Sequence, residues 1–300
     1  MSRSRHLALA GALATLAALG PRPAAADIVN IEARRPTLPS ERKDGWSGSF
    51  ALKFAFRTGN LFLIDIGPNG TVNWLRGRHS VLSLFSYNFA AKADPKSGQS
   101  INDLGRQDSA FRHNGLGHLR YAFEVLRWLD VEAYTQLATD QFLLLRTRYL
   151  VGFGPRFALF EDDLFGAYLG TSYYAEHERL DPDQFLLQPG GQGPTNWWHR
   201  WSNYLTLRLR ATESLLLTSI TYVQPRFDRL RDVYLLNDSV LEFKVSPYIS
   251  FTLSTSIRFD SAPPTYCTGE ADPAGSCPSA SVYTLPTTDV RVENALLVSF

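Results

Sequence analysis

Apolar and polar side chains alternate with a period of two along much of the chain. In SFALKFAF, the apolar residues Phe50, Leu52, Phe54 and Phe56 fall on one face, and serine, alanine and lysine fall on the other. The stretches NYLTLRLRA and SFTLSTSIRFD repeat the pattern with arginine among the polar positions. Successive side chains of a strand point to opposite faces. The pattern therefore predicts strands with one apolar face and one charged face.

Twelve segments of this kind can be counted. Each is longer than the ~5–6 residues of an ordinary strand, and long enough for the ~9–11 residues that a tilted strand needs to cross a bilayer. The sequence thus predicts an all-β fold, a transmembrane antiparallel β-barrel of about twelve strands. The segments are 46–57, 60–75, 79–90, 110–126, 130–140, 146–159, 164–178, 197–211, 214–225, 232–244, 249–260 and 287–300.

Three of the six connections that follow odd-numbered segments are long, and no long connection follows an even-numbered one. The long ones, 91–109, 179–196 and 261–286, follow the third, seventh and eleventh segments, whereas the connections after even segments are tight. Outer-membrane barrels have short periplasmic turns and longer outer loops. We therefore expect both termini in the periplasm, with 27–45 as a periplasmic segment and 46–300 as the barrel.

One stretch leaves the strand count open. LIDIGPNGTVNW contains Pro68, which cannot donate a ladder hydrogen bond, between Gly67 and Gly70. It is either a bulge in the second strand or a true turn. We keep twelve strands because each half is too short to span.

The first residues predict a signal peptide, 1–26. Arg3 and Arg5 precede an apolar run that ends near Gly20, and three alanines finish at Ala26, where we expect cleavage. A membrane-anchoring helix is the alternative, but the run is shorter than the ~20 residues that a span requires. The mature chain then carries 27 Lys and Arg against 29 Asp and Glu, because Arg3, Arg5 and Arg22 are removed. This balance gives no sign of nucleic-acid binding.

Export also suggests how the two cysteines are used. Cys267 and Cys277 lie in a stretch rich in proline, glycine and serine, which is typical of a loop. In an oxidising compartment, a disulfide closing this loop is the plain expectation. The stretch offers too few ligands for a metal, and no sequence feature calls for a cofactor.

Aromatic residues fall near the predicted strand ends. Tryptophan prefers membrane–water interfaces, so we expect interface positions for Trp46, Trp74, Trp128, Trp197, Trp198 and Trp201. The final strand ends in Leu296, Val298 and Phe300 on one face. In hydrocarbon a sheet must join its edges, so this strand should pair with the first one. A terminal phenylalanine is also what the outer-membrane assembly machinery recognises in barrels that this chain resembles.

The charged residues of the polar face are the candidate site. Inside a barrel they would either line a passage for small solutes or fill the lumen as a network of ion pairs, and both readings stand. Gly152 and Gly154 share this face, either to make room for such side chains or to mark curvature. The candidates are Lys53, Arg120, Glu124, Glu132, Arg148, Arg156, Glu176, Arg208, Arg210 and Arg258.

An outer-membrane hydrolase is the rival class. His177 and His199 flank a predicted outer loop, with Glu176, Glu178 and Asp181 nearby. A hydrolase needs a nucleophile, a base and an orienting group in contact, and no Gly-x-Ser-x-Gly or His-Glu-x-x-His motif is present. We therefore expect no enzyme activity and name no catalytic residue.

Several stretches resemble the salt-induced outer-membrane protein family, a domain of unknown function (481). The likeness runs over most of 45–300 and depends on order and spacing. It implies an outer-membrane barrel linked to envelope or osmotic stress, and no settled activity. The stretches that carry it include GWSGSFALKFAFRTGN, HLRYAFEVLRWLDVEAYTQ, LLRTRYLVGFGPRFAL, GTSYYAEHE, TYVQP and RFDSAPP.

Overall fold

The computed structural model describes most of the chain after residue 42. The described residues are 43–58, 62–105, 110–141, 145–180, 195–263, 265–267, 282–284 and 286–300. The predicted signal peptide, Asp181 and Cys277 lie outside them, as do most of the predicted periplasmic segment and the side chain of Cys267. Signal cleavage and the disulfide therefore stay predictions.

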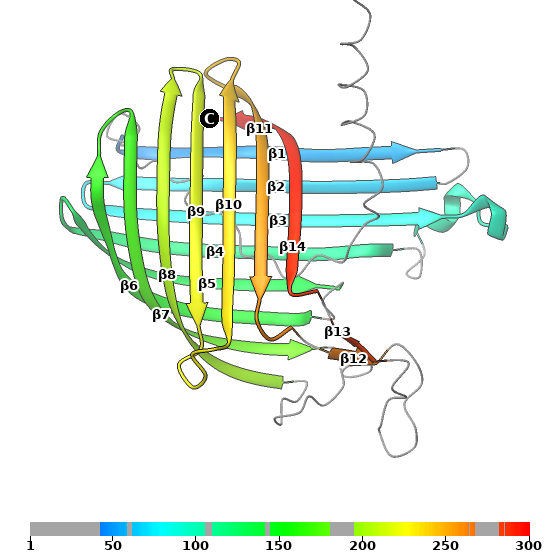
Figure 1. The fold of residues 1–300 in the computed structure, drawn as a ribbon. Helices are drawn as coiled ribbons and strands as arrows, with labels where there is room; N and C mark the ends of the chain where they lie inside the picture. The colour runs from blue at the N-terminus through cyan, green and yellow to red at the C-terminus, as the bar shows by residue number, and fades with distance from the viewer. Residues whose placement is uncertain are drawn as a thin grey trace, which may run out of the picture.

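Twelve antiparallel strands close into a barrel, which confirms the predicted fold class. Neighbours in the chain are neighbours in the sheet, and β14 completes the ring between β11 and β1 (Figure 1). The barrel strands are β1 (Gly45–Arg57), β2 (Phe62–Arg76), β3 (His79–Ala93), β4 (Ala110–Leu126), β5 (Leu129–Asp140), β6 (Leu145–Glu161), β7 (Phe165–Leu180), β8 (Thr195–Thr212), β9 (Leu215–Pro225), β10 (Val233–Lys244), β11 (Ile249–Asp260) and β14 (Thr288–Ser299).

Two connections contain structure that the sequence did not predict. The 261–286 connection was expected to be loop, but β12 (Thr265–Cys267) and β13 (Val282–Thr284) pair within it as a small separate sheet. The 91–109 connection contains the short 3-10 helices η4 (Pro95–Ser97) and η5 (Ile101–Gly105). Strands of three residues are too short to show a two-residue alternation, so the pattern could not reveal them.

Pro68 resolves as neither a turn nor a bulge. Strand β2 runs straight through it, and Leu52 of β1 pairs with Pro68 in unbroken register. On the other side, the ladder to β3 is interrupted at Gly67 and Pro68 and resumes at Asn69 in the same register. A proline has no N–H to donate, so β2 loses local pairing with β3 without shifting.

Short and long connections lie at opposite ends of the barrel. The tight turns after β2, β4, β6, β8 and β10 share one end with Gly45 and Phe300, and the longer connections share the other. The last strand pairs with the first, as expected: the N–H of Phe300 donates to the Gly48 carbonyl, and the N–H of Gly48 donates to the Phe300 carbonyl, each at 3.0 Å.

The two faces of the sheet differ in chemistry, as the alternation predicts. The outward face carries exposed apolar side chains on every barrel strand, and they include Phe54, Val72, Leu137, Phe153 and Phe251. The inward face buries polar and charged residues with only small apolar clusters, such as Leu84, Leu116 and Ala138. No helix in the described ranges is long and apolar enough to cross a bilayer.

Candidate functional site

All ten predicted charged residues lie on the inward parity of their strands. Six of them are buried: Arg120, Glu132, Arg156, Glu176, Arg208 and Arg258. Arg148 is nearly so, whereas Lys53, Glu124 and Arg210 are half-buried. The alternation therefore found the correct face, and the structure adds which of these groups meet.

Two ion pairs lie toward the short-turn end of the lumen. Arg120 Nη1 is 2.9 Å from Glu132 Oε2, and the same carboxylate oxygen accepts a hydrogen bond from the Tyr204 hydroxyl at 2.8 Å. Arg156 Nη1 is 3.1 Å from Asp130 Oδ2. Buried charges require partners of this kind, because losing water is costly.

A larger network lies toward the end with the longer connections. Arg148 pairs with Glu176 at 3.0 Å and with Glu178 at 2.6 Å. Arg200 lies 3.8 Å from Glu176 and 3.4 Å from Asp232. The network therefore joins strands β6, β7 and β8 to the β9–β10 connection, which fixes the charges in place.

Arg226 extends this network out of the strands. It lies 2.9 Å from Asp232 and also binds Asp228. The hydrogen bond from Arg226 holds the pKa of the Asp228 carboxyl below its ordinary value. A lowered folded-state pKa stabilises the fold above the unfolded pKa, and that contribution is lost as the pH falls through the folded value.

One predicted interface aromatic is wrong. Trp198 has the inward parity of Arg200, and the guanidinium of Arg226 lies 3.6 Å above its ring. A cation–π contact thus holds Trp198 in the lumen. The other five predicted tryptophans point outward; among them Trp46 and Trp74 are neighbours, with ring centroids 6.3 Å apart.

Inward tyrosine rings cover the arginines, and glycines on neighbouring strands make room for these rings. The guanidinium of Arg156 lies 3.9 Å from the Tyr168 ring, and that of Arg120 lies 5.1 Å from the Tyr134 ring. A side chain at Gly152 would meet Tyr134 at 2.4 Å. Of the two roles open for Gly152, making room is therefore the one seen here.

Gly154 is tight for a different reason. A Cβ there would lie 2.1 Å from the Thr171 carbonyl oxygen, so the backbone of β7 is the obstacle.

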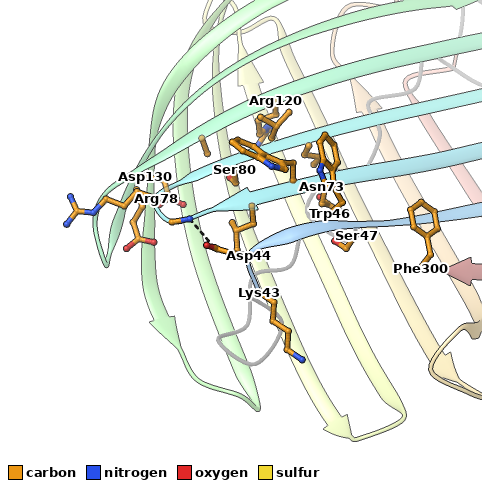
Figure 2. Close-up of a pocket in the computed structure, with 17 residues that line it drawn as sticks. Lys43, Asp44, Trp46, Ser47, Asn73, Arg78, Ser80, Arg120, Asp130 and Phe300 are labelled. Carbon is orange, nitrogen blue, oxygen red and sulfur yellow. Dashed lines mark hydrogen bonds between the residues drawn. The ribbon is translucent and has the colours of Figure 1, made fainter.

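The opposite wall of the lumen carries small polar side chains and encloses space. A cavity of about 560 Å³ lies at the short-turn end (Figure 2), bounded by Lys43, Ser47 and Asn73 on one side and by Arg120 and Asp130 on the other. A second cavity, of about 170 Å³, lies against the next inward residues of β2 and β3, which include Thr71 and Leu84.

The two cavities follow one another along the same wall. Asn73 and Leu82 line the first, and the neighbouring inward positions Thr71 and Leu84 line the second. The lumen is thus divided: the buried ion pairs described above lie on the β4–β9 side, and the two cavities lie against β1–β3, with β10, β11 and β14 also lining the smaller one.

Several residues of the charged side were missed from the sequence. Arg200 shares the parity of Arg208 on β8, so the alternation contained the signal. Asp130 faces Arg156 across β5 and β6 and could have been read the same way. Arg226 and Asp232 lie in a connection, where no period marks the inward side.

The histidine cluster is split by the same alternation. His177 and His199 point outward, where His177 contacts Trp197 and His199 Nδ1 lies 2.6 Å from the Tyr173 hydroxyl. Glu176 points inward to Arg148. The described residues contain no group of three or more His, Cys, Asp or Glu placed to hold a metal ion.

The chain belongs to the family described as "Protein of unknown function, DUF481", which it matches over residues 54–268. This result confirms the resemblance seen in the sequence. No curated protein matches the chain.

Solved barrels are similar to it only distantly. A structure titled as the NanC porin is 10% identical, with a TM-score of 0.41, over 84% of this chain and 97% of its own. The CymD monoaromatic hydrocarbon channel is 9% identical, with a TM-score of 0.38, over 92% of this chain and 93% of its own. The translocator domain of autotransporter NalP from Neisseria meningitidis is 8% identical, with a TM-score of 0.38, over 85% of this chain and 86% of its own.

Proposed function

We propose that the protein is an outer-membrane barrel that passes small polar solutes or ions along the β1–β3 side of its lumen. The observation that carries the proposal is the pair of adjoining cavities, of about 560 and 170 Å³, beside a wall of fixed charges. The outward apolar face suits lipid, because a barrel is one of the two folds that satisfy all backbone groups in hydrocarbon.

The lining explains how a solute would move. Asn69, Thr71 and Ser86 offer hydrogen bonds without net charge, and Arg120 and Asp130 present one charge of each sign at the wider cavity. Conduction needs binding that is favourable enough to enter and weak enough to leave. Charges already held by partners attract a passing solute without trapping it.

Single-channel recording from refolded protein in planar bilayers tests this proposal. We expect discrete conductance steps, and Thr71→Trp, which fills the narrower cavity, should reduce them about tenfold or abolish them, since conduction depends on the radius of the constriction. Ser83→Trp, on the outward face of β3, is the matched control and should conduct normally.

A lumen filled by ion pairs is the second candidate. The buried network around Arg148, Glu176 and Arg200 favours it. The protein would then be a structural barrel with any binding role in its outer loops. Silence in the bilayer from protein that is demonstrably folded would select this function over a pore.

The proposal includes the route to the membrane. The sequence predicts that residues 1–26 are removed and that both termini lie in the periplasm. It also predicts that the outer-membrane assembly machinery recognises the final strand through Leu296, Val298 and Phe300. N-terminal sequencing of exported protein should begin at Asp27, and an earlier start would contradict the predicted cleavage.

The stress role follows from the family resemblance alone. Protein levels in the native host should rise when salt is raised in the medium, and quantitative immunoblotting would measure the change. Unchanged protein levels across a salt series would contradict the proposed stress role.

A further inference from the structure

The seam that closes the barrel is much shorter than its other ladders. Strands β1 and β14 are joined by three residue pairs, Ser49 with Ser299, Phe50 with Val298 and Ala51 with Leu297, followed by the mutual hydrogen bonds of Gly48 and Phe300. Every other neighbouring pair of barrel strands shares nine or more residue pairs.

Beyond Ala51 the two strands separate. Strand β1 continues to Arg57, and β14 begins at Thr288, yet no residue pair joins these lengths, which both lie wholly within the described ranges. Figure 1 shows β14 close to β1 near the C-terminus, and the rest of β14 running in a different direction from β1. Strands β1 and β14 are therefore paired at the short-turn end of the barrel, and a gap without residue pairs separates them toward the other end.

The smaller cavity lies on the lumen side of this gap between β1 and β14. Its lining comes from both sides of the seam: Lys53 of β1 on one side, and Arg291, Glu293 and Ala295 of β14 on the other. Most of the remaining lining is uncharged and polar, with Asn69, Ser86, Thr252, Ser254 and Ser256 among it. The cavity is thus shared between the lumen and the gap in the wall.

Charged groups at this gap are far more accessible than those of the opposite wall. The side chains of Arg291 and Glu293 are 31% and 40% exposed and 3.8 Å apart, whereas the Arg156 side chain is 1% exposed. Lys53 balances Asp65 at 3.2 Å. These four groups carry no net charge, and the remaining charged residue of the cavity lining, Asp238, is buried.

The rims of the gap are apolar on their outward side. Phe54 and Phe56 of β1 and Val290 and Val292 of β14 are all exposed there. Irregular backbone at membrane depth is tolerated only where it is buried in protein or lines a water-filled cavity. A polar cavity that opens between apolar rims matches a molecule with one polar end and one apolar end.

We propose that the β1–β14 gap is a lateral portal for a single-chain amphiphile with an uncharged polar head. The head occupies the smaller cavity, where serine, threonine and asparagine side chains replace its water, and the chain lies between the rims in lipid. The portal depends on the proposed membrane location. It opens through the wall into the smaller cavity, which the proposed axial passage also crosses.

Photolabelling of the reconstituted protein tests the portal. The probe is monododecanoylglycerol with a diazirine close to its ester, added to phosphatidylcholine vesicles that contain the refolded protein. After irradiation, mass spectrometry should find label on inward residues such as Ser254, Ser256 and Asn69, and unlabelled monododecanoylglycerol should compete for it. Label confined to outward side chains around the whole barrel would overturn the proposal.

Two variants sharpen the result. Ala295→Trp places a bulky ring inside the gap and should reduce inward labelling about tenfold, equivalent to a tenfold loss of affinity. Leu296→Trp, on the outward face one residue away, should leave it unchanged. Equal inward labelling in both variants would also contradict the portal. If Ala295→Trp does not fold, the wild-type labelling pattern still decides.

A third variant separates the portal from the proposed pore. Asn73→Trp, whose side chain lies in the larger cavity and not in the smaller one, should reduce conductance while inward labelling persists at the gap. Inward labelling without conductance would reject the pore and keep the portal, and conductance without inward labelling would do the reverse.

Discussion

Buried arginines set the character of the lumen at the scale of single residues. Arg120, Arg148 and Arg156 each contact a carboxylate from a neighbouring strand, and two of them also lie over a tyrosine ring. A buried ion pair contributes little net stability against an apolar replacement, but breaking one by removing a single partner is costly. These residues therefore fix positions more than they stabilise the fold.

Arg156→Ala should destabilise the barrel by about 3–5 kcal/mol, because Asp130 would be left buried without its ion-pair partner. Urea unfolding of protein in lipid vesicles would measure the loss. Arg127→Ala, at an exposed turn position of the same barrel end, is the control and should change stability little. Equal stability of the two variants would show that the pair is dispensable.

Gly154→Ala should cost about 1–3 kcal/mol, since overpacking forces backbone to shift and the obstacle is the Thr171 carbonyl oxygen. Gly117→Ala, at an exposed outward position of β4, is the control, because a Cβ there meets nothing within 4 Å. Thermal unfolding, followed by the gel mobility shift of folded barrel, compares them. A smaller loss for Gly154→Ala than for Gly117→Ala would contradict the close strand approach.

At the scale of elements, the seam is the distinctive part of the barrel. Eleven of the twelve ladders are long, and the twelfth ends after three residue pairs and the Gly48–Phe300 contact. The phenylalanine ring lies against Gly48, where a Cβ would approach it to 2.5 Å. The last residue of the chain is therefore part of the closure, and not only an exposed tail.

Deleting Phe300 should lower stability by about 2 kcal/mol, because two backbone hydrogen bonds contribute roughly 1 kcal/mol each. Refolding into lipid vesicles without any assembly factor isolates this effect from recognition in the cell. Glu213→Ala, at an exposed position in the turn between β8 and β9, is the comparison and should leave the unfolding midpoint nearly unchanged. A midpoint unaffected by the deletion would mean that Phe300 serves assembly alone.

The sequence predicted the elements better than their meeting points. Alternation in stretches such as 249–260 marks both the strand and its inward side, so the twelve strands and the ten inward charges were accessible. Which carboxylate meets which arginine depends on register and barrel curvature, as with Glu176 between Arg148 and Arg200. The position of Trp198 was not predicted, because a tryptophan suits both a membrane interface and a stacked position beside Arg226 in the lumen.

At the scale of the whole molecule, the barrel is asymmetric around its axis. Bulky tyrosines and buried ion pairs fill the β4–β9 side. The cavities lie against β1–β3, the smaller one also against β10, β11 and β14, and it adjoins the short seam. A barrel of about this width lies between filled small barrels and wide porins. Asymmetric filling explains how one lumen can hold many buried charges and still contain cavities of about 560 and 170 Å³.

Thiol modification of single channels tests this divided lumen most directly. In a Cys267→Ser/Cys277→Ser background, an impermeant methanethiosulfonate should block Asn69→Cys channels, because Asn69 lines the smaller cavity. Thr206→Cys, which is fully buried in the opposite wall, should stay unmodified and conduct. Block of Thr206→Cys together with unchanged current through Asn69→Cys would contradict a passage along β1–β3.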